Sequence, residues 1–404
     1  MAPPRGMRDV LPDATEALAA LTSRLMGTFA RFGYRRVTTP AFEYAEVLER
    51  GMSNVDRAEQ LRFFEPGTGE LTLLRPDMTP QIARIVATRL GHLPPPFRLA
   101  YHGTVLRRRK GRARLARQST QAGIELIGMD GDRADLEVIG LAARGLEAAG
   151  LERFVIELSQ VRLGQQALEA VPEPLRVRAA DALARKDTAQ LEAILSEGRT
   201  AKRTRQRLMR LTELYGDRSI LGVARRKLRD EASRTALDEL ARVTEALEDS
   251  GLGDRLAFDL GELRGHGYYT GVSFNLLADG PGEPLGGGGR YDDLLGRYGR
   301  PSPATGFALD VGHLQWALEL AGNAPKAERA PRWAVVTGDP LAGTLRSAGV
   351  EVSEVEGPLK RALDFARAWG YDGAVAKGRF ERVDGVARKG DELDEATLAF
   401  VRGE

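Results

Sequence analysis

The chain has 404 residues, 42% of them hydrophobic, which is enough to bury a sizeable core and to form more than one domain. Because 59 lysines and arginines nearly balance 57 aspartates and glutamates, giving a net charge of +2, any nucleic-acid binding must depend on local basic patches. Cysteine is absent and only four histidines occur, which excludes disulfides, thiolate zinc sites and a cysteine nucleophile, and we expect no metal site and no cofactor.

The chain carries no signal for secretion or for membrane insertion. Its first residues, MAPPRGMRDVLPD, contain no apolar signal-peptide core, and no uninterrupted apolar run reaches about 18 residues. We therefore expect a soluble, cytoplasmic protein that makes no contact with a membrane.

The sequence opens with a predicted helix and a short strand. Residues 14–32 repeat apolar side chains at helical spacing, and Gly33 ends the helix. Residues 34–40 predict a strand, and because Pro40 has no amide proton to donate, this strand suits an edge or an interface.

The next predicted unit is again a strand followed by a helix. The strand starts at Leu71 and runs into a turn that carries Asp77 and Thr79, and residues 81–90 predict a helix. From the spacing alone, Asp77 is a helix N-cap or a turn residue.

Residues 99–128 predict two apolar strands joined by a very basic loop. From Arg107 to Arg117 there are seven cations and no acid, so the loop attracts phosphate; a solvated surface and a non-specific nucleic-acid patch are the competing interpretations. After the loop, Gln121 and Glu125 point to the same face of the second strand. Polar side chains on an apolar strand require a ligand or an internal partner, and for Glu125 a core arginine would serve.

Residues 133–150 predict a helix and residues 153–159 a strand, and the composition changes after them. Residues 162–250 show long charged helical patterns with leucine and alanine at helical spacing, which we interpret as a helical insertion. Its basic cluster is a candidate RNA contact, although a solvated helix face or a protein interface explains it equally well. The cluster comprises Lys202, Arg203, Arg205, Arg207 and Arg210.

Residues 256–274 predict two strands around Gly265 and Gly267. Tyr268 and Tyr269 follow these glycines, and ordinary alternating strand packing would account for both of them.

A glycine-rich run, GGGGRYD, begins at Gly286 and resembles a phosphate loop only superficially. No Gly-Lys-Ser/Thr follows it, so a Walker A motif is excluded. Residues 303–314 then predict a strand followed by a helix.

The C-terminal part predicts a separate small domain. Residues 321–331 form a polar, proline-containing linker, and residues 332–404 predict a small α/β domain. Its predicted strands are 333–337, 350–355 and 373–376, and its predicted helices are 341–347 and 359–369.

Three of these segments resemble the motifs of class II aminoacyl-tRNA synthetases in their histidyl form. The opening helix, strand and Pro40 resemble motif 1, the dimer-forming element of that family. Arg107, with Gln121 and Glu125 at fixed offsets, resembles motif 2. The run GGRYD and residues 303–314 resemble the lead-in to motif 3 and motif 3 itself.

The resemblance implies an α+β fold. Residues 1–320 would form a class II synthetase-like antiparallel sheet with flanking helices, interrupted by the helical insertion at about 162–250. Residues 332–404 resemble a shortened anticodon-binding domain, for which leftover tRNA binding and a packing or interface role are the alternatives; we favour the second.

The resemblance also implies a pocket for histidine, in which carboxylates and a glutamine oxygen accept from the ammonium and an arginine pairs with the carboxylate. Glu125 and a tyrosine hydroxyl would address the imidazole. Asp77 stands where the family carries glutamate, and Gly267 where it carries aspartate. The expected histidine-binding residues are Asp77, Thr79, Gln121, Glu125, Arg264, Tyr268 and Tyr269.

The nucleotide half of the site departs further from the family. Arg107 remains, but Arg109 aligns with the glutamate that faces adenine, Ser119 with the aromatic that stacks on it, and His313 with the motif 3 arginine. Losing these contacts weakens both ATP binding and stabilisation of the transition state, so we expect a vestigial nucleotide site and no catalytic residue.

A fold that keeps its amino-acid pocket and loses its nucleotide site is similar to the regulatory-subunit family of ATP phosphoribosyltransferase, which the run LRPDMTPQIAR closely matches. That resemblance implies a non-catalytic chain, a dimer within a hetero-octamer, that activates a short catalytic subunit and mediates feedback inhibition by L-histidine in the first step of histidine biosynthesis. The alternatives are a histidine-tRNA ligase and an RNA-binding, translation-associated protein; we expect no tRNA binding.

Overall fold

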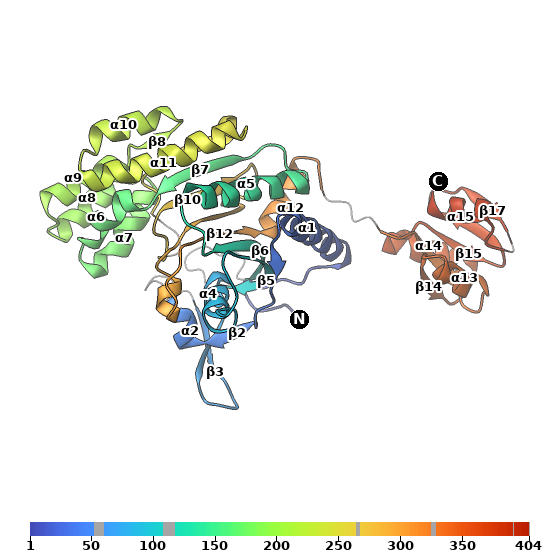
Figure 1. The fold of residues 1–404 in the computed structure, drawn as a ribbon. Helices are drawn as coiled ribbons and strands as arrows, with labels where there is room; N and C mark the ends of the chain where they lie inside the picture. The colour runs from blue at the N-terminus through green and yellow to red at the C-terminus, as the bar shows by residue number, and fades with distance from the viewer. Residues whose placement is uncertain (52–59, 108–117, 264–266, 325–328, 391, 404) are drawn as a thin grey trace. The chain divides into compact units, whose positions relative to one another are not determined.

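The computed structural model describes residues 1–51, 60–107, 118–263, 267–324, 329–390 and 392–403 (Figure 1). The chain forms two compact units, Met1–Lys326 and Ala327–Glu404, and each has its own sheet and core. No helix among the described residues is both long enough and apolar enough to cross a lipid bilayer.

A nine-stranded, mainly antiparallel sheet forms the centre of the first unit. The pairs β1–β5 and β7–β9 are parallel, and the remaining neighbours run antiparallel. Because β1 lies at one end of the sheet, the predicted edge position of the strand before Pro40 is confirmed. In sheet order the strands are β1 (Arg35–Arg36), β5 (Phe97–Leu106), β6 (Gln118–Ile127), β12 (Ala304–Asp310), β11 (Gly286–Arg290), β10 (Val272–Leu277), β7 (Val155–Gln160), β9 (Leu256–Asp259) and β8 (Tyr215–Gly216).

The two apolar runs on either side of the basic loop pair with each other as β5 and β6, as the sequence predicts. Their register sets Leu99 opposite Glu125, and on the other side of β6 the strand β12 sets Gly306 opposite the same glutamate. Glu125 therefore lies in the middle of the sheet. The loop itself, residues 108–117, lies outside the described residues.

The glycine-rich run forms strand β11, which the sequence did not predict. A Cβ atom on Gly288 would lie 2.1 Å from the carbonyl oxygen of Gly306, and one on Gly287 would lie 2.6 Å from that of Phe274. Since β12 and β10 approach β11 this closely, side chains would force the strands apart. Glycine has low strand propensity, so a propensity argument misses this strand.

Helices α1 (Pro12–Arg31), α5 (Asp132–Ala149) and α12 (Val311–Leu320) lie together along the sheet (Figure 1). Phe29 of α1 is fully buried, and its ring meets that of Phe307 on β12 edge to face at 5.6 Å. α5 ends at Gly150, whose φ of +97° is left-handed, as is common at helix ends. The predicted helices over residues 14–32 and 133–150 are confirmed to within two residues at each end.

A second, three-stranded sheet consists of β2 (Phe42–Tyr44), β4 (Leu71–Leu74) and β3 (Leu61–Phe64), beside helix α2 (Ala45–Arg50). The helix after the Asp77 turn, α4 (Thr79–Thr88), begins two residues earlier than predicted. Its N-cap residue is Met78 and no side chain caps it, so the N-cap interpretation of Asp77 is wrong. The carboxylate of Asp77 faces a tyrosine instead, as described below.

The region predicted as an insertion is helical and gathers beside β7 and β9 (Figure 1). In its basic cluster, Arg205 meets Glu192, Arg207 meets Asp230, and Arg210 donates to the carbonyl oxygen of Lys227. These contacts agree with the interpretation of the cluster as a solvated helix face. The helices are α6 (Arg162–Glu169), α7 (Glu173–Ala184), α8 (Thr188–Glu197), α9 (Lys202–Leu211), α10 (Ser219–Lys227) and α11 (Glu231–Asp249), followed by the short turn η1 (Gly253–Arg255); another short turn, η2 (Leu295–Tyr298), follows β11.

The described residues of the second unit form a five-stranded sheet and three helices. Trp333 is fully buried, and its indole N–H donates to the carbonyl oxygen of Val401 on the last helix at 3.1 Å. The last two strands and the last helix were not predicted, because their short runs are rich in charged residues. In sheet order the strands are β14 (Glu351–Val355), β13 (Arg332–Val336), β15 (Gly373–Ala376), β16 (Arg379–Arg382) and β17 (Ala387–Lys389), with helices α13 (Leu341–Ser347), α14 (Leu359–Trp369) and α15 (Glu395–Arg402).

Candidate ligand-binding site

Glu125 on β6 is 1% exposed and accepts hydrogen bonds from three hydroxyl groups. Its Oε1 accepts from Thr79 Oγ1 at 2.6 Å and from Tyr101 at 3.0 Å, and its Oε2 accepts from Tyr291. Gly306 provides the space, since a Cβ there would lie 1.8 Å from Oε2. The partners of Glu125 are thus hydroxyls and not the core arginine considered from the sequence.

The electrostatics of this network favour a protonated carboxyl. Burial raises the pKa of Glu125 to about 8, and the hydrogen bonds from Thr79 and Tyr291 oppose that rise only in part. Burial, and then the neighbouring Glu125, raise the pKa of the Tyr101 and Tyr291 hydroxyls well above the ordinary value. Near neutral pH the carboxyl therefore carries a proton, which it donates to one of these neutral hydroxyls, while the other hydroxyls donate to it.

A second carboxylate, Asp77, adjoins this network. Asp77 is 3% exposed and its Oδ2 accepts from the Tyr268 hydroxyl at 2.9 Å. The Tyr268 ring packs edge to face against Tyr269 at 5.1 Å and against Tyr291 at 5.6 Å. The two tyrosines lie in the connection between β9 and β10, so the alternative of alternating strand packing is wrong.

A cavity of about 230 Å³ opens beside this network. Gln121 is 7% exposed, and its Oε1 is buried without a hydrogen-bond partner among the described residues, which leaves an acceptor for a ligand. The predicted residues that line the cavity are Arg107, Ser119, Gln121, Tyr269 and His313. The predicted residues in the hydrogen-bond network, outside the cavity lining, are Asp77, Thr79, Glu125 and Tyr268.

Arg107 and His313 approach the cavity from different elements. Arg107 follows β5, and its Nε donates to the carbonyl oxygen of Pro76 at 2.7 Å. His313 lies in the first turn of α12, where the N-cap residue Asp310 accepts from the backbone N–H of His313 at 3.1 Å. The imidazole Nδ1 lies 3.1 Å from the carbonyl oxygen of Pro284. Two other predicted site residues, Arg109 and Arg264, lie outside the described residues.

Four carboxylates line the cavity and form what we call its acidic wall, which the sequence reasoning missed. Glu157 on β7 accepts from the Asn275 side chain at 3.1 Å, and burial raises the pKa of its carboxyl. The alternating polar residues of β7 would have indicated Glu157, because side chains two apart on a strand share a face. The carboxylates that line the cavity are Glu157, Glu262, Glu283 and Asp310.

Two tyrosines of the network were also missed. Tyr101 on β5 lies opposite Gly123 on β6. Tyr101 is therefore a diagonal cross-strand neighbour of Glu125, two residues further along β6. Tyr291 follows the glycine strand β11, whose existence was not predicted. The described residues contain no group of three or more histidine, aspartate or glutamate side chains placed to hold a metal ion.

Comparisons with known proteins agree with this geometry. A family model described as histidyl-tRNA synthetase matches residues 6–314. The ATP phosphoribosyltransferase regulatory subunit of Anaeromyxobacter dehalogenans (strain 2CP-1 / ATCC BAA-258) is 44% identical over 340 residues, which are 83% of this chain and 96% of that protein. The chain belongs to the ATP phosphoribosyltransferase regulatory-subunit family.

Two further relatives extend the match over both units. The ATP phosphoribosyltransferase regulatory subunit of Moorella thermoacetica (strain ATCC 39073 / JCM 9320) is 40% identical over 402 residues, 99% of this chain and 96% of that protein. A crystal structure described as an ATP phosphoribosyltransferase regulatory subunit/histidyl-tRNA synthetase from Bacillus halodurans C is 30% identical, with a TM-score of 0.77, and covers 92% of this chain and 97% of that one. The expected class II synthetase-like fold and the regulatory-subunit family are thereby confirmed.

Proposed function

We propose that this member of the regulatory-subunit family binds free L-histidine in the pocket around Gln121 and Glu125 and transmits its presence to a short-form ATP phosphoribosyltransferase catalytic subunit, which it otherwise activates. The proposal is supported by the contrast between a buried hydrogen-bond network around Glu125 and Asp77 and the acidic cavity lining beside it. The chain would act in the first step of histidine biosynthesis, in the cytoplasm, without catalysing a reaction itself.

The pocket supports histidine binding through complementary groups. The Oε1 of Gln121, which has no partner among the described residues, suits the ammonium. Glu125 lies outside the cavity lining, so we propose that it addresses the imidazole once histidine displaces one of its hydroxyl partners. We assign the carboxylate of histidine to Arg264. Charge-assisted hydrogen bonds of this kind contribute about 1.5–3 kcal/mol each, so a few of them give micromolar-range affinity after the costs of association.

The same cavity is poorly suited to ATP. Among its described lining residues, four carboxylates stand against the single guanidinium of Arg107, which repels a triphosphate. Ser119 offers no ring for adenine to stack on, and His313 lacks the guanidinium fork of the motif 3 arginine. If each loss costs about 2–3 kcal/mol, adenylation falls by several powers of ten.

Histidine would regulate the catalytic subunit because its binding is coupled to the state of the complex. Histidine shifts the equilibrium between an activating and an inhibiting state of the complex only as far as it binds one state better than the other. We propose that the chain forms a dimer through the motif 1-like segment around β1 and assembles as a hetero-octamer. This assembly would bring the pocket of each copy into a shared structure with the catalytic chains.

We do not expect tRNA to be a partner. Residues 332–404 contain 11 lysines and arginines against 13 aspartates and glutamates, so the second unit lacks the positive charge that a phosphate backbone requires. In the insertion, Arg205 and Arg207 are engaged in ion pairs. A packing or interface role for the second unit is more consistent with this composition.

A coupled assay tests the proposal. The short catalytic subunit should gain activity when the chain is added and lose it again when histidine is added. Glu125→Ala should keep the activation but abolish the response to histidine, whereas Glu354→Ala, on the surface of the second unit, should behave as wild type. An unchanged histidine response in Glu125→Ala would place the effector elsewhere.

The second candidate is a histidine-tRNA ligase, favoured by the retained Arg107 and by the second unit. Histidine-dependent exchange of pyrophosphate into ATP distinguishes the two, because a ligase must form the adenylate and the proposed sensor does not.

A further inference from the structure

A segment that borders the cavity forms hydrogen bonds with the helical insertion at both of its ends. This wall segment, residues 259–263 and 267–270 of the described chain, connects β9 to β10 and carries Tyr268 and Tyr269. Tyr269 lines the cavity, and Tyr268 donates to Asp77. The position of this segment therefore affects both the cavity and the network.

At its first end the wall segment lies directly on the insertion. Lys186, in the turn after α7, donates from Nζ to Asp259 Oδ1 at 2.5 Å. The backbone N–H of Leu260 donates to the carbonyl oxygen of Leu214 at 2.9 Å. A Cβ on Gly261 would lie 2.6 Å from the carbonyl oxygen of Leu211, so only glycine permits this approach.

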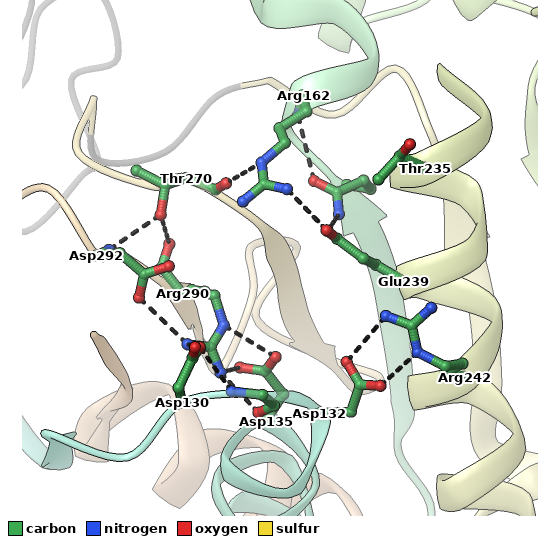
Figure 2. Close-up of polar contacts among 12 residues, drawn as sticks. Asp130, Asp132, Asp135, Arg162, Thr235, Glu239, Arg242, Thr270, Arg290 and Asp292 are labelled. Carbon is green, nitrogen blue, oxygen red and sulfur yellow. Dashed lines mark hydrogen bonds and ion pairs between the residues drawn. The ribbon is translucent and has the colours of Figure 1, made fainter. Parts of the chain in front are cut away.

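At its second end the wall segment is held by Arg162, the first residue of α6 (Figure 2). The Nε of Arg162 donates to the carbonyl oxygen of Thr270 at 2.6 Å. Its Nη1 donates to both carboxylate oxygens of Glu239 on α11, at 2.8 and 3.0 Å. One guanidinium thus joins two insertion helices to the residue that follows Tyr269.

Thr270 is also the point where the wall segment joins the sheet. Its backbone N–H donates to the carbonyl oxygen of Arg290 at 2.7 Å, and its hydroxyl accepts from the N–H of Asp292 at 3.0 Å (Figure 2). The buried side chain of Arg290 is in turn paired with Asp135 at the start of α5. A shift of the insertion relative to the sheet would therefore displace Thr270, which follows the cavity-lining Tyr269.

We propose that Arg162 and Lys186 are positioning residues through which the helical insertion sets the orientation of Tyr268 and Tyr269, and with it the affinity of the pocket. The part that concerns histidine rests on the function proposed above. The ion pair between Arg162 and Glu239 is half-exposed and contributes little stability by itself. Its effect comes from geometry, because the rigid guanidinium fork bonds a carboxylate and a carbonyl at once.

The test compares Arg162→Ala and Lys186→Ala with Arg242→Ala. Arg242 also pairs the insertion with the core, through Asp132 on α5, but it does not touch the wall segment (Figure 2). The two arginines are similarly exposed, 43% for Arg162 and 53% for Arg242, so the control removes a comparable surface pair. The measurements are amide hydrogen exchange over residues 267–270 and calorimetric affinity for histidine.

We expect Arg162→Ala and Lys186→Ala to exchange faster over residues 267–270 and to bind histidine about 5- to 20-fold more weakly, while Arg242→Ala matches wild type in both measurements. Arg162→Lys should recover part of the affinity, because an ammonium can still donate to the Thr270 carbonyl. If Arg162→Ala proves poorly folded by urea titration, Lys186→Ala provides the test.

The proposal is overturned if both variants behave like Arg242→Ala in exchange and in affinity. Should wild type itself not bind histidine, the proposed function fails, and the exchange measurement alone decides whether Arg162 and Lys186 position the wall segment. The two failures are therefore distinguishable.

Discussion

The buried network around Glu125 and the acidic wall that includes Glu157 are adjacent, but their polar groups are arranged differently. In the network, hydroxyl groups satisfy both oxygens of a carboxyl, and burial keeps that carboxyl protonated near neutral pH. The wall instead presents several carboxylates to an open cavity. The first arrangement suits selective recognition of a small polar molecule, and the second disfavours the triphosphate that a synthetase must bind.

Removing the centre of the network should have the largest effect. Glu125→Ala leaves the hydroxyls of Thr79, Tyr101 and Tyr291 without their shared acceptor, at a cost of about 2–4 kcal/mol in stability. Histidine binding should fall at least about 100-fold, since both the acceptor and the order of the tyrosines are lost. Calorimetry and urea unfolding measure the two effects, and near-normal histidine binding would contradict the assigned role of Glu125.

Filling the space behind the network should have the next largest effect. Gly306→Ala would place a Cβ 1.8 Å from Glu125 Oε2 and 2.5 Å from the carbonyl oxygen of Ile124, so β6 and β12 must separate. We expect a loss of about 1–3 kcal/mol in unfolding free energy together with weaker histidine binding.

The matched control is Gly140→Ala on α5, where, apart from its chain neighbours and the backbone of its own helix, no atom lies within 4 Å of the added Cβ. Because alanine favours helix more than glycine does, this variant should gain up to about 1 kcal/mol in urea unfolding. Equal stability of the two variants would show that the close approach at Gly306 is not required.

The network should also make histidine binding depend on pH. We expect the complex to hold one proton between Glu125 and the imidazole, whose own pKa is about 6.5. Between about pH 6.5 and 8 the free partners also hold one proton, so affinity should be constant there. Above pH 8 binding must take up a proton, and below 6.5 it must release one, so affinity should fall by up to about tenfold per pH unit on either side.

The stability of the unliganded protein should also depend on pH through Glu125. Because the folded pKa of Glu125 is raised from 4.5 to about 8, its contribution to stability is present below pH 4.5 and is lost as the pH rises through 8. Glu125→Gln cannot titrate, so its unfolding free energy should vary less with pH over this interval. Identical pH profiles for the two proteins would refute the raised pKa.

Restoring one arginine to the cavity lining should have the smallest effect on ligand binding. His313→Arg returns the side chain found in motif 3, but the four lining carboxylates remain. We expect ATP affinity to rise less than about tenfold, with no pyrophosphate exchange, as measured by calorimetry and a radiolabel assay. A large gain would mean that His313 alone had closed the nucleotide site.

The sequence predicted the elements with clear periodicity and the residues that resemble known motifs. The helices at 341–347 and 359–369 and the paired strands around the basic loop were predicted because their apolar patterns are regular. Gln121 and Glu125 were recognised because two polar side chains on an apolar strand need partners. These signals are local, and local signals are visible in a single sequence.

What was missed depends on contacts between distant segments. The glycine strand β11 forms because its neighbours approach too closely for side chains, which no propensity indicates. Tyr101 and Tyr291 join Glu125 only through the strand register, and Asp77 faces Tyr268 from 191 residues away. The acidic wall likewise gathers Glu157 of β7 and Asp310 of β12 with Glu262 and Glu283 from connecting segments.

Separate calorimetric titrations of the purified chain with L-histidine and with ATP test the central contrast most directly. We predict saturable micromolar-range binding of histidine, lost in Glu125→Ala, and no measurable binding of ATP in the presence or absence of histidine. Tight ATP binding that is strengthened by histidine and accompanied by pyrophosphate exchange would contradict the proposed sensor and identify a working ligase.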